Sequence, residues 1–291
     1  MDYTKIIFEK DDGIARITLN VPEKLNPVGQ VMIDEISYAL EDAAEDERVK
    51  VVIFKAAGRA FSAGHSLNDF GNWYGLSPDK KKRKESQEFK LRRDRKMSEF
   101  YRKIYTHPKV TIAQVNGLAV GAGLYLSILR EITIAAERAT FSHAEMRLGH
   151  GGTTYILPIE FALIGVKKCR ELMLTGEPID AKEAKEIGMV NRVVPDDKLE
   201  EEVMRIAKVI CLNPADGIAI GKAHMHLALD AMGIGQAFSS GYILHALFNN
   251  LRLQPDEFNY FKVAAEKGLK EAAHERDARY EALGVKKVTS W

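Results

Sequence analysis

Three short runs of β-branched and other apolar residues constrain the fold of this chain more than any other feature. They are VKVVIFKAAG at 49–58, PKVTIAQVNG at 108–117 and EITIAAE at 131–137. Each run is too apolar for a strand with one face in water, so together they predict a largely buried sheet. Apolar residues at helical spacing precede the first run, at 30–46, and separate the other two, at 122–131. This repeated alternation predicts an α/β fold of stacked ββα or βαβ units.

The two ends of the chain differ from this central pattern. Residues 5–20 hold two apolar runs around an Asp-Asp-Gly turn, which predicts a β-hairpin. From residue 213 onward three helical patterns follow with no strand between them, at 213–232, 236–250 and 255–283. We therefore divide the chain into a core that carries the site, 1–205, and a helical region, 206–291. Apolar residues on more than one face of these helices fit either a packed subdomain or a subunit interface.

The charge and the cysteine content exclude several classes of protein. Lys plus Arg number 42 and Asp plus Glu number 41, a balance that indicates neither a nucleic-acid nor a membrane partner. The two cysteines, Cys169 and Cys211, lack the spacing of metal ligands or of a disulfide framework. No apolar run approaches the ~18 residues of a membrane span, and the N-terminus has no secretory signal pattern. We expect a soluble, cytoplasmic protein without a metal.

One segment, 80–103, is strongly basic, with twelve Lys or Arg against four Asp or Glu. From Met97 onward, Phe100, Tyr101 and Ile104 keep helical spacing, which indicates that this end of the segment packs. The segment fits a solvated insertion before a helix or, alternatively, a mobile basic arm beside a polyanionic ligand. A nucleic-acid site is the weaker interpretation, because no stacking aromatic residues are interleaved with the basic ones.

Two turns of small residues, SAGH at 62–65 and VGAG at 120–123, follow predicted strands. Backbone N–H groups at the start of a helix have no acceptor within the helix, and two such groups aimed at one point form an oxyanion hole. Small side chains are required there, because the carbonyl group of a ligand must approach the main chain. Gly-rich turns between strands and helices are common, so neither turn is specific alone.

The stretches around these turns are GRAFSAGHSLNDF at 58–70, HPKVTIAQVNGLAVGAGLYLSILREITIAAERATFSHAEMRLG at 107–149 and TGEPIDAKEAKEIGMVNRVVP at 175–195. In this order and spacing they resemble the crotonase superfamily, which includes enoyl-CoA hydratases and isomerases. The resemblance implies a crotonase-like spiral of ββα repeats with a C-terminal all-helical trimerisation region, assembled as a homotrimer or a dimer of trimers. It also implies an acyl-CoA substrate and no separate cofactor, since coenzyme A enters as part of the thioester.

Matched residue by residue, the resemblance implies two backbone N–H donors for the thioester oxygen, at His65 and Ala122. Hydratases of the family carry two glutamates in the site. The second is Glu145 here, whereas the position of the first holds Tyr125. His150, in the next loop, is a further candidate acid or base. His143 is a weaker one.

The implied contacts with coenzyme A or substrate are Lys24, Leu25, Asn26, Ala63, Ser66, Leu67, Asn68 and Gly121. Cations for the phosphates of the ligand would come from the 80–103 segment or from the C-terminal helix of a neighbouring subunit.

The loss of one carboxylate changes the chemistry that is available. Glu145 alone can remove a proton and return it elsewhere, which is sufficient to move a double bond, whereas two carboxylates serve hydration conveniently. We expect desolvation to raise the pKa of Glu145. Tyr125 is either a hydrogen-bond donor or a core residue. The expected function is an acyl-CoA enzyme of the hydratase/isomerase type. The alternatives are a thioester or C–C hydrolase, a decarboxylase, and a catalytically silent protein that binds CoA esters.

Overall fold

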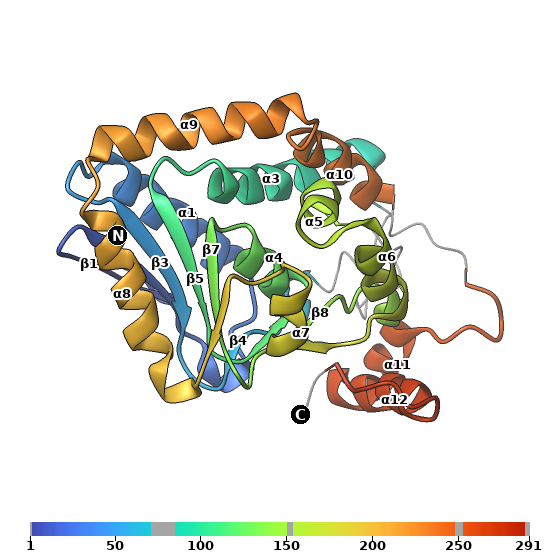
Figure 1. Cartoon of the computed structure of the whole chain (residues 1–291). Helices are drawn as coiled ribbons and strands as arrows, with labels where there is room; N and C mark the ends of the chain where they lie inside the picture. Colours follow the sequence, from blue (N-terminus) through green and yellow to red (C-terminus); the bar gives the residue numbers. More distant parts are fainter. Residues whose placement is uncertain (1, 71–84, 150–153, 248–252, 289–291) are drawn as a thin grey trace.

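A computed structural model describes residues 2–70, 85–149, 154–247 and 253–288 (Figure 1). Its centre is a six-stranded sheet in the order β1-β2-β3-β5-β7-β10, in which only the β1–β2 hairpin is antiparallel. The strands are β1 Ile6–Asp11, β2 Ile14–Leu19, β3 Val51–Ala56, β5 Val110–Val115, β7 Ile132–Ala136 and β10 Arg192–Val194. The hairpin was predicted, and the three apolar runs are the buried strands β3, β5 and β7. Both predictions are confirmed.

A second sheet has four short strands in the order β4-β6-β8-β9. They are β4 Ala60–Ser62, β6 Leu118–Val120, β8 Thr140–Ser142 and β9 Ile179–Asp180. β4, β6 and β8 are parallel, and β9 runs antiparallel to β8. Since β3, β5 and β7 lead directly into β4, β6 and β8, each repeat contributes one strand to each sheet. This arrangement confirms the predicted ββα repeats.

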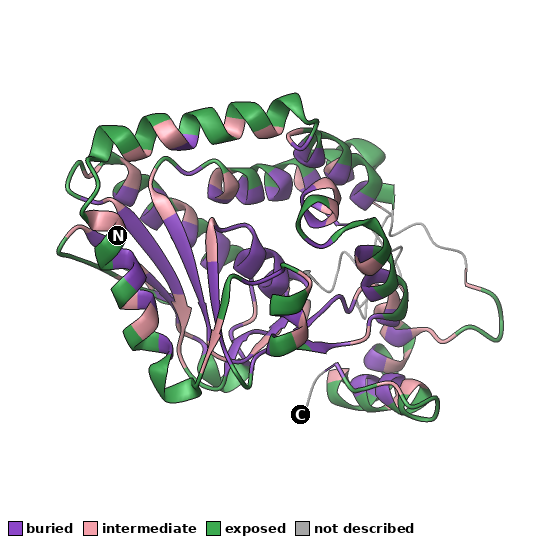
Figure 2. Cartoon of the chain, viewed as in Figure 1, coloured by how far each residue is buried: buried purple, intermediate pink, exposed green. Residues whose placement is uncertain are grey.

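Helices cover both faces of the larger sheet. α1 (Gln30–Glu45) shares a core with Val52 and Phe54, and α8 (Leu199–Cys211) shares another with Val51 and Ile53. Alternate residues of a strand point to opposite faces, so β3 is buried between two helical layers (Figure 2). The expected boundary between residues 205 and 206 lies inside α8, which is continuous there.

The remaining helices lie around the two sheets (Figure 1). They are α2 Leu67–Phe70, α3 Gln87–Tyr105, α4 Ala122–Ile128, α5 Leu157–Ile164, α6 Val166–Thr175, α7 Ala181–Glu186, α9 Ala215–Ala231, α10 Gln236–Leu247, α11 Tyr260–Lys267 and α12 Leu269–Glu281. Within the described ranges, no helix combines the length and the apolar composition that crossing a membrane requires.

The pattern at 255–283 forms two helices, so its prediction as one helix is wrong. α11 begins at Tyr260, where the Asn259 side chain accepts a hydrogen bond from the backbone N–H of Lys262. It ends at Gly268, whose φ of +92° lies in the region that favours glycine. α12 then packs back on α11 through a small apolar core. Apolar periodicity continues across this break because both helices bury residues in the same core.

Residues 87–103 of the basic segment belong to α3, so the helix begins ten residues before Met97, where packing was expected to start. The side chains of Phe100 and Tyr101 are buried in the core. Charges on the exposed side pair with carboxylates, for example Lys103 with Glu41 at 2.5 Å. Residues 80–84 lie outside the described residues, so the alternative of a basic arm stays untested for them.

Candidate active site

Three loops meet at one edge of the four-stranded sheet. They follow the parallel strands β4, β6 and β8, whose carboxyl ends lie beside one another. The first loop holds the SAGH turn, the second holds Gly121 and Ala122, and the third runs from His143 to Glu145. Ligands of parallel sheets commonly bind at this edge. Pairing of the strands therefore brings together motifs that are far apart in the chain.

The first two loops touch where only glycine fits. Gly64 has a φ of +96°, and a Cβ atom there would lie 2.8 Å from the carbonyl oxygen of Val120 and 3.6 Å from the nitrogen of Ala122. Ala122 is the first residue of α4, so its N–H has no acceptor within the helix. On the other side, a Cβ atom on Gly121 would lie 3.2 Å from Oε1 of Glu145. The start of α4 is therefore flanked by the SAGH turn and by a carboxylate.

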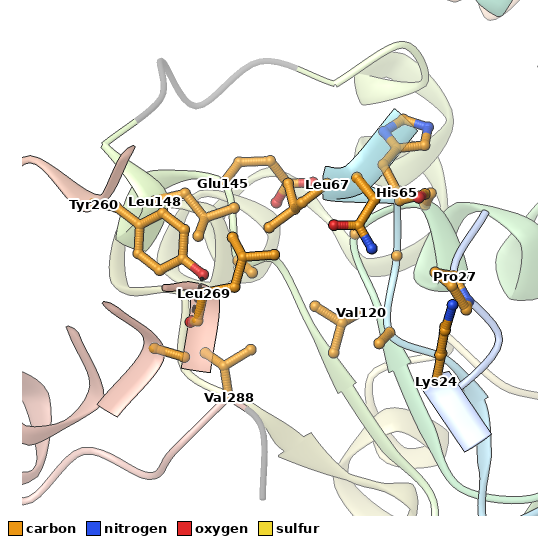
Figure 3. A pocket seen from close by; sticks show the side chains of 18 of the residues that line it. Lys24, Pro27, His65, Leu67, Val120, Glu145, Leu148, Tyr260, Leu269 and Val288 are labelled. Carbon is orange, nitrogen blue, oxygen red and sulfur yellow. Dashed lines mark hydrogen bonds between the residues drawn. The ribbon is translucent and has the colours of Figure 1, made fainter. Parts of the chain in front are cut away.

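These loops line a cavity of about 440 Å³ (Figure 3). The residues implied by the resemblance that line it are Lys24, Ala63, His65, Ser66, Leu67, Asn68, Gly121, Ala122, Tyr125 and Glu145. Leu25 and Asn26 do not line it. His150 lies outside the described residues. The structure thus gathers most of the predicted positions around one space.

Leu25 and Asn26 shape the loop that carries Lys24. The buried Asn26 side chain accepts a hydrogen bond from the backbone N–H of Val21 at 2.8 Å, and it donates to the carbonyl oxygens of Ala57 and Ala60. Leu25 is also buried, and its carbonyl oxygen accepts the N–H of Ala63 at 2.9 Å. Both residues therefore hold the loop against β4 and present no side chain to the cavity.

Tyr125 and Glu145 are directly bonded. The Tyr125 hydroxyl donates a hydrogen bond of 2.6 Å to Oε1 of Glu145. Burial, together with the carboxylates of Glu145 and Glu160, raises the pKa of Tyr125 well above its ordinary value. The ring packs edge-on against Tyr101, with centroids 5.6 Å apart. Tyr125 is therefore both a core residue and a hydrogen-bond donor, and it keeps its proton.

His143, the weaker of the two histidine candidates, lies next to Glu145. Nδ1 of His143 is 3.6 Å from Oε2 of Glu145, and Nε2 is 2.9 Å from Oε1 of Glu160 on α5. Burial by itself lowers the pKa of His143, but the two carboxylates outweigh it and raise the pKa to about 10.

Our expectation of a raised pKa for Glu145 is wrong. Burial does raise it, but the neighbouring His143 and the hydrogen bond from Tyr125 lower the pKa of Glu145 to about 2. The expectation considered the apolar surroundings alone. The carboxyl group is ionised because a cation shares its buried site.

A second polar group of side chains lines the same cavity, and of its members His245 and Asp94 were not found from the sequence. Tyr155 and His245 both line the cavity, and each lies 2.8 Å from Oδ1 of the buried Asp94 on α3. The Tyr101 hydroxyl is 3.0 Å from Nε2 of His65. Burial is the main cause that lowers the pKa of His65, to about 4. Hydroxyl and imidazole groups that are bonded within the protein thus form part of this wall.

The C-terminal helices of the same chain complete the cavity. Tyr260 of α11, Leu269 and Lys270 of α12, and Val288 beyond it contribute to the lining. Figure 3 shows Tyr260, Leu269 and Val288 on one side and Lys24 on the other. A cation of the lining, Lys270, thus comes from this chain's own α12. The spacing of apolar residues predicted helices in this region, but it did not predict which face of each helix packs against the core.

The arrangement brings a charged carboxylate, a neutral hydroxyl and the N–H of a helix start to one cavity. Such a site can stabilise negative charge on an oxygen near Ala122 while Glu145 accepts or returns a proton nearby. In the part of the chain that the structure describes, no cluster of three His, Cys, Asp or Glu side chains is arranged to hold a metal ion.

Comparisons with known proteins identify chains that are similar to this one. Residues 9–258 match the family model described as enoyl-CoA hydratase/isomerase. The rat (Rattus norvegicus) enoyl-CoA hydratase domain-containing protein 3, mitochondrial, is 32% identical over 247 residues, which cover 84% of this chain and 77% of that protein.

Two crystal structures show the same fold. That of an enoyl-CoA hydratase/isomerase from Xanthobacter autotrophicus Py2 has a TM-score of 0.80 at 33% identity, and the match covers 96% of this chain and 99% of the other. That of an enoyl-CoA hydratase from Mycobacterium smegmatis has a TM-score of 0.81 at 23% identity, with 96% of each chain covered. The second likeness concerns the fold alone.

Proposed function

Because this chain belongs to the enoyl-CoA hydratase/isomerase family, we propose that it moves a proton on the acyl group of an enoyl-CoA thioester. The thioester oxygen accepts hydrogen bonds from the backbone N–H groups of His65 and Ala122, and Glu145 is the base. One observation carries this proposal. The Glu145 carboxylate lies against Gly121, the residue before Ala122. A base and an oxyanion donor thus reach neighbouring atoms of one substrate.

The proposed reaction uses one carboxylate twice. Glu145 removes a proton from the acyl chain, and the electron pair of that C–H bond moves toward the thioester oxygen to form an enolate. The two N–H donors stabilise the oxygen charge. The carboxyl group then returns the proton to a different carbon, and the double bond has moved. Hydration makes a larger demand, because the same carboxyl group must deprotonate water and protonate the α-carbon.

The coenzyme A part of the substrate is supported by charges at the cavity. Lys24, in a short 3-10 turn, and Lys270, on α12, are both exposed and both line the cavity. Lysine side chains in such a position attract the phosphate groups of the coenzyme. Apolar residues, among them Val120 and Leu148, line the cavity as well and suit the uncharged pantetheine chain.

We also propose that the chain assembles as a homotrimer or a dimer of trimers and works in the cytoplasm. Four large apolar side chains on and just after α9, Ile220, Met225, Leu227 and Met232, are 61–72% exposed. Figure 2 shows α9 as largely exposed. Clustered apolar residues on a surface are typical of subunit contacts. Sedimentation of the purified chain tests the assembly, and fractionation of cells tests the location, since the rat relative is mitochondrial by name.

The reaction is tested by turnover in heavy-oxygen water with a panel of linear and cyclic enoyl-CoA esters. The expected product has the same mass as the substrate and a displaced double bond. Glu145→Gln, which keeps the shape and removes the charge, should lower kcat by ~10²–10⁴. A product that gains one water with its thioester intact indicates a hydratase. Free coenzyme A indicates a hydrolase, and loss of carbon dioxide a decarboxylase. Equal inactivity of wild type and Glu145→Gln, with CoA esters still bound, would identify a silent binding protein.

A further inference from the structure

His143 faces a carboxylate with each of its ring nitrogens. Nδ1 lies 3.6 Å from Glu145, and Nε2 lies 2.9 Å from Glu160. A neutral imidazole has one N–H and one lone pair. In the neutral form one ring nitrogen would therefore hold a lone pair close to a buried carboxylate. The cationic form is attracted to both carboxylates, although neither contact has the geometry of a hydrogen bond, so the arrangement favours the cation.

Burial makes this selection strong. The side chains of His143 and Glu160 are 3% and 1% exposed. Without a cation, the carboxylates of Glu145 and Glu160 would be two like charges in a poorly solvated space, which is costly. One imidazolium between two carboxylates leaves the group with a single negative charge.

The two carboxylates are also held from their other sides. Oε2 of Glu160 accepts a hydrogen bond of 3.0 Å from the hydroxyl of Thr154. Oε1 of Glu145 accepts the Tyr125 hydroxyl at 2.6 Å. Each oxygen of Glu145 therefore has a neighbour, a neutral donor on Oε1 and a cation near Oε2. The Tyr125 hydrogen bond holds Oε1, and attraction to the cation favours the orientation that keeps Oε2 beside His143.

We propose that His143 is a positioning residue whose imidazolium, anchored by Glu160, fixes the Glu145 carboxylate in the cavity wall and keeps it ionised. This inference rests on the proposed function, in which Glu145 is the base. In this reaction His143 touches neither the substrate nor the enolate, and it acts only through Glu145. It sets the charge of Glu145 at a site where Tyr125 stands at the position of the first family glutamate.

The titration behaviour of the group agrees with this assignment. The pKa of His143 is raised to about 10 and that of Glu145 is lowered to about 2. The charged or titratable groups that face His143 are Glu145 in its own loop, Glu160 on α5 and Tyr125 on α4. Tyr125 stays neutral because its pKa is raised. Across neutral pH the base is therefore ready to accept a proton.

The test is the pH profile of kcat/KM in the full-length enzyme for wild type, His143→Gln and the double variant His143→Gln/Glu160→Gln. In wild type the acid limb lies below the accessible range. In His143→Gln, Glu145 loses its cation and keeps Glu160 as a like-charged neighbour. The acid limb should then move up by about 1–3 pH units or more. In the double variant the like charge is gone, so the limb should lie between the other two.

His224→Gln is the matched control, because it makes the same exchange on the exposed face of α9. Its profile should equal that of wild type. An acid limb that stays in place in a folded His143→Gln protein would overturn the inference. So would a limb in the double variant at or above that of His143→Gln.

A spectroscopic measurement keeps the inference testable if His143→Gln does not fold. Carboxyl carbon resonances of ¹³C-glutamate-labelled wild type are followed from pH 8 to about pH 4, and Glu145→Gln assigns the signal of Glu145. The expected signal does not titrate in this range. A signal that titrates near the ordinary value of glutamate would refute the role of His143. If Glu145→Gln is instead as active as wild type, it is the proposed function that fails.

Discussion

Replacing Gly64 with alanine tests whether the two small-residue turns form one oxyanion site. At its φ of +96°, an alanine costs about 1–3 kcal/mol of folding free energy from backbone strain. In addition, the new Cβ atom would lie 2.8 Å from the carbonyl oxygen of Val120, whereas ordinary contact begins at 3.4 Å. That oxygen belongs to the main chain directly before the second turn. The two turns must therefore move apart by several tenths of an ångström.

The expected loss of activity distinguishes this variant from one that only destabilises the fold. Removing one oxyanion donor typically costs about 10²–10³ in kcat, and a misplacement near 1 Å costs about 10². We expect Gly64→Ala to lower kcat/KM for an enoyl-CoA ester by ~10²-fold, with the affinity for free coenzyme A nearly unchanged. Steady-state kinetics and calorimetric titration measure the two quantities.

Gly165→Ala provides the matched control. Gly165 also has a positive φ, +75°, but a Cβ atom there would meet nothing within 4 Å. This variant should lose a similar 1–3 kcal/mol, roughly, in chemical denaturation while keeping kcat/KM. If Gly64→Ala and Gly165→Ala are equally active, the SAGH turn does not contribute to the oxyanion site and the reasoning fails.

Three further predictions test separate parts of the structure. Tyr125→Phe should lower kcat by ~10-fold and leave KM similar, because a hydrogen bond to a charged group contributes about 1.5–3 kcal/mol net and the ring packing stays. An unchanged kcat would show that the bond to Glu145 is not used. Lys270→Glu should raise KM for a CoA ester at low salt. It should not raise KM for the matching pantetheine ester, because that ester lacks the nucleotide phosphates. Equal effects on both esters would contradict a contact between Lys270 and a phosphate. Glu35 accepts hydrogen bonds from Thr4 and from the N–H groups of Lys5 and Ile6. Burial raises the pKa of Glu35, but these hydrogen bonds outweigh burial, so that the pKa is lowered overall. The contribution of the Glu35 carboxylate to the free energy of unfolding is therefore present above the ordinary pKa and is lost as the pH falls. Glu35→Gln should destabilise the protein by about 1.5–3 kcal/mol at pH 7 and by less at pH 3. A loss of stability that does not depend on pH would refute this.

Elements with strong local signals were predicted well. The runs at 49–58, 108–117 and 131–137 are strands because β-branched residues and burial act along a few consecutive residues. The hairpin around Gly13 needed only a turn signal, and the turn has the positive φ that its residues accommodate. The break at Gly268 was missed, because a glycine inside an apolar period is tolerated as often as it ends a helix.

The candidate site was predicted in part. The two turns and Glu145 were found from the motifs, and strand pairing placed them together. Tyr125 and His143 were candidates as well, but Glu160, the carboxylate on the other side of His143, was not. Glu160 lies in an apolar stretch of α5, where the sequence shows no reason for a buried carboxylate. Its role depends on how α5 lies against the loop after β8.

What the sequence alone determined is the succession of strands, turns and helices, together with the identity of the groups that can do chemistry. These follow from preferences that act between residues a few positions apart. Only the tertiary structure decided the charge of those groups. The ionisation of Glu145 depends on His143 and Glu160 meeting in a space shielded from water, where electrostatic interactions over 3–4 Å outweigh the cost of burial. Such an encounter depends on distance in space, which spacing along the chain does not encode.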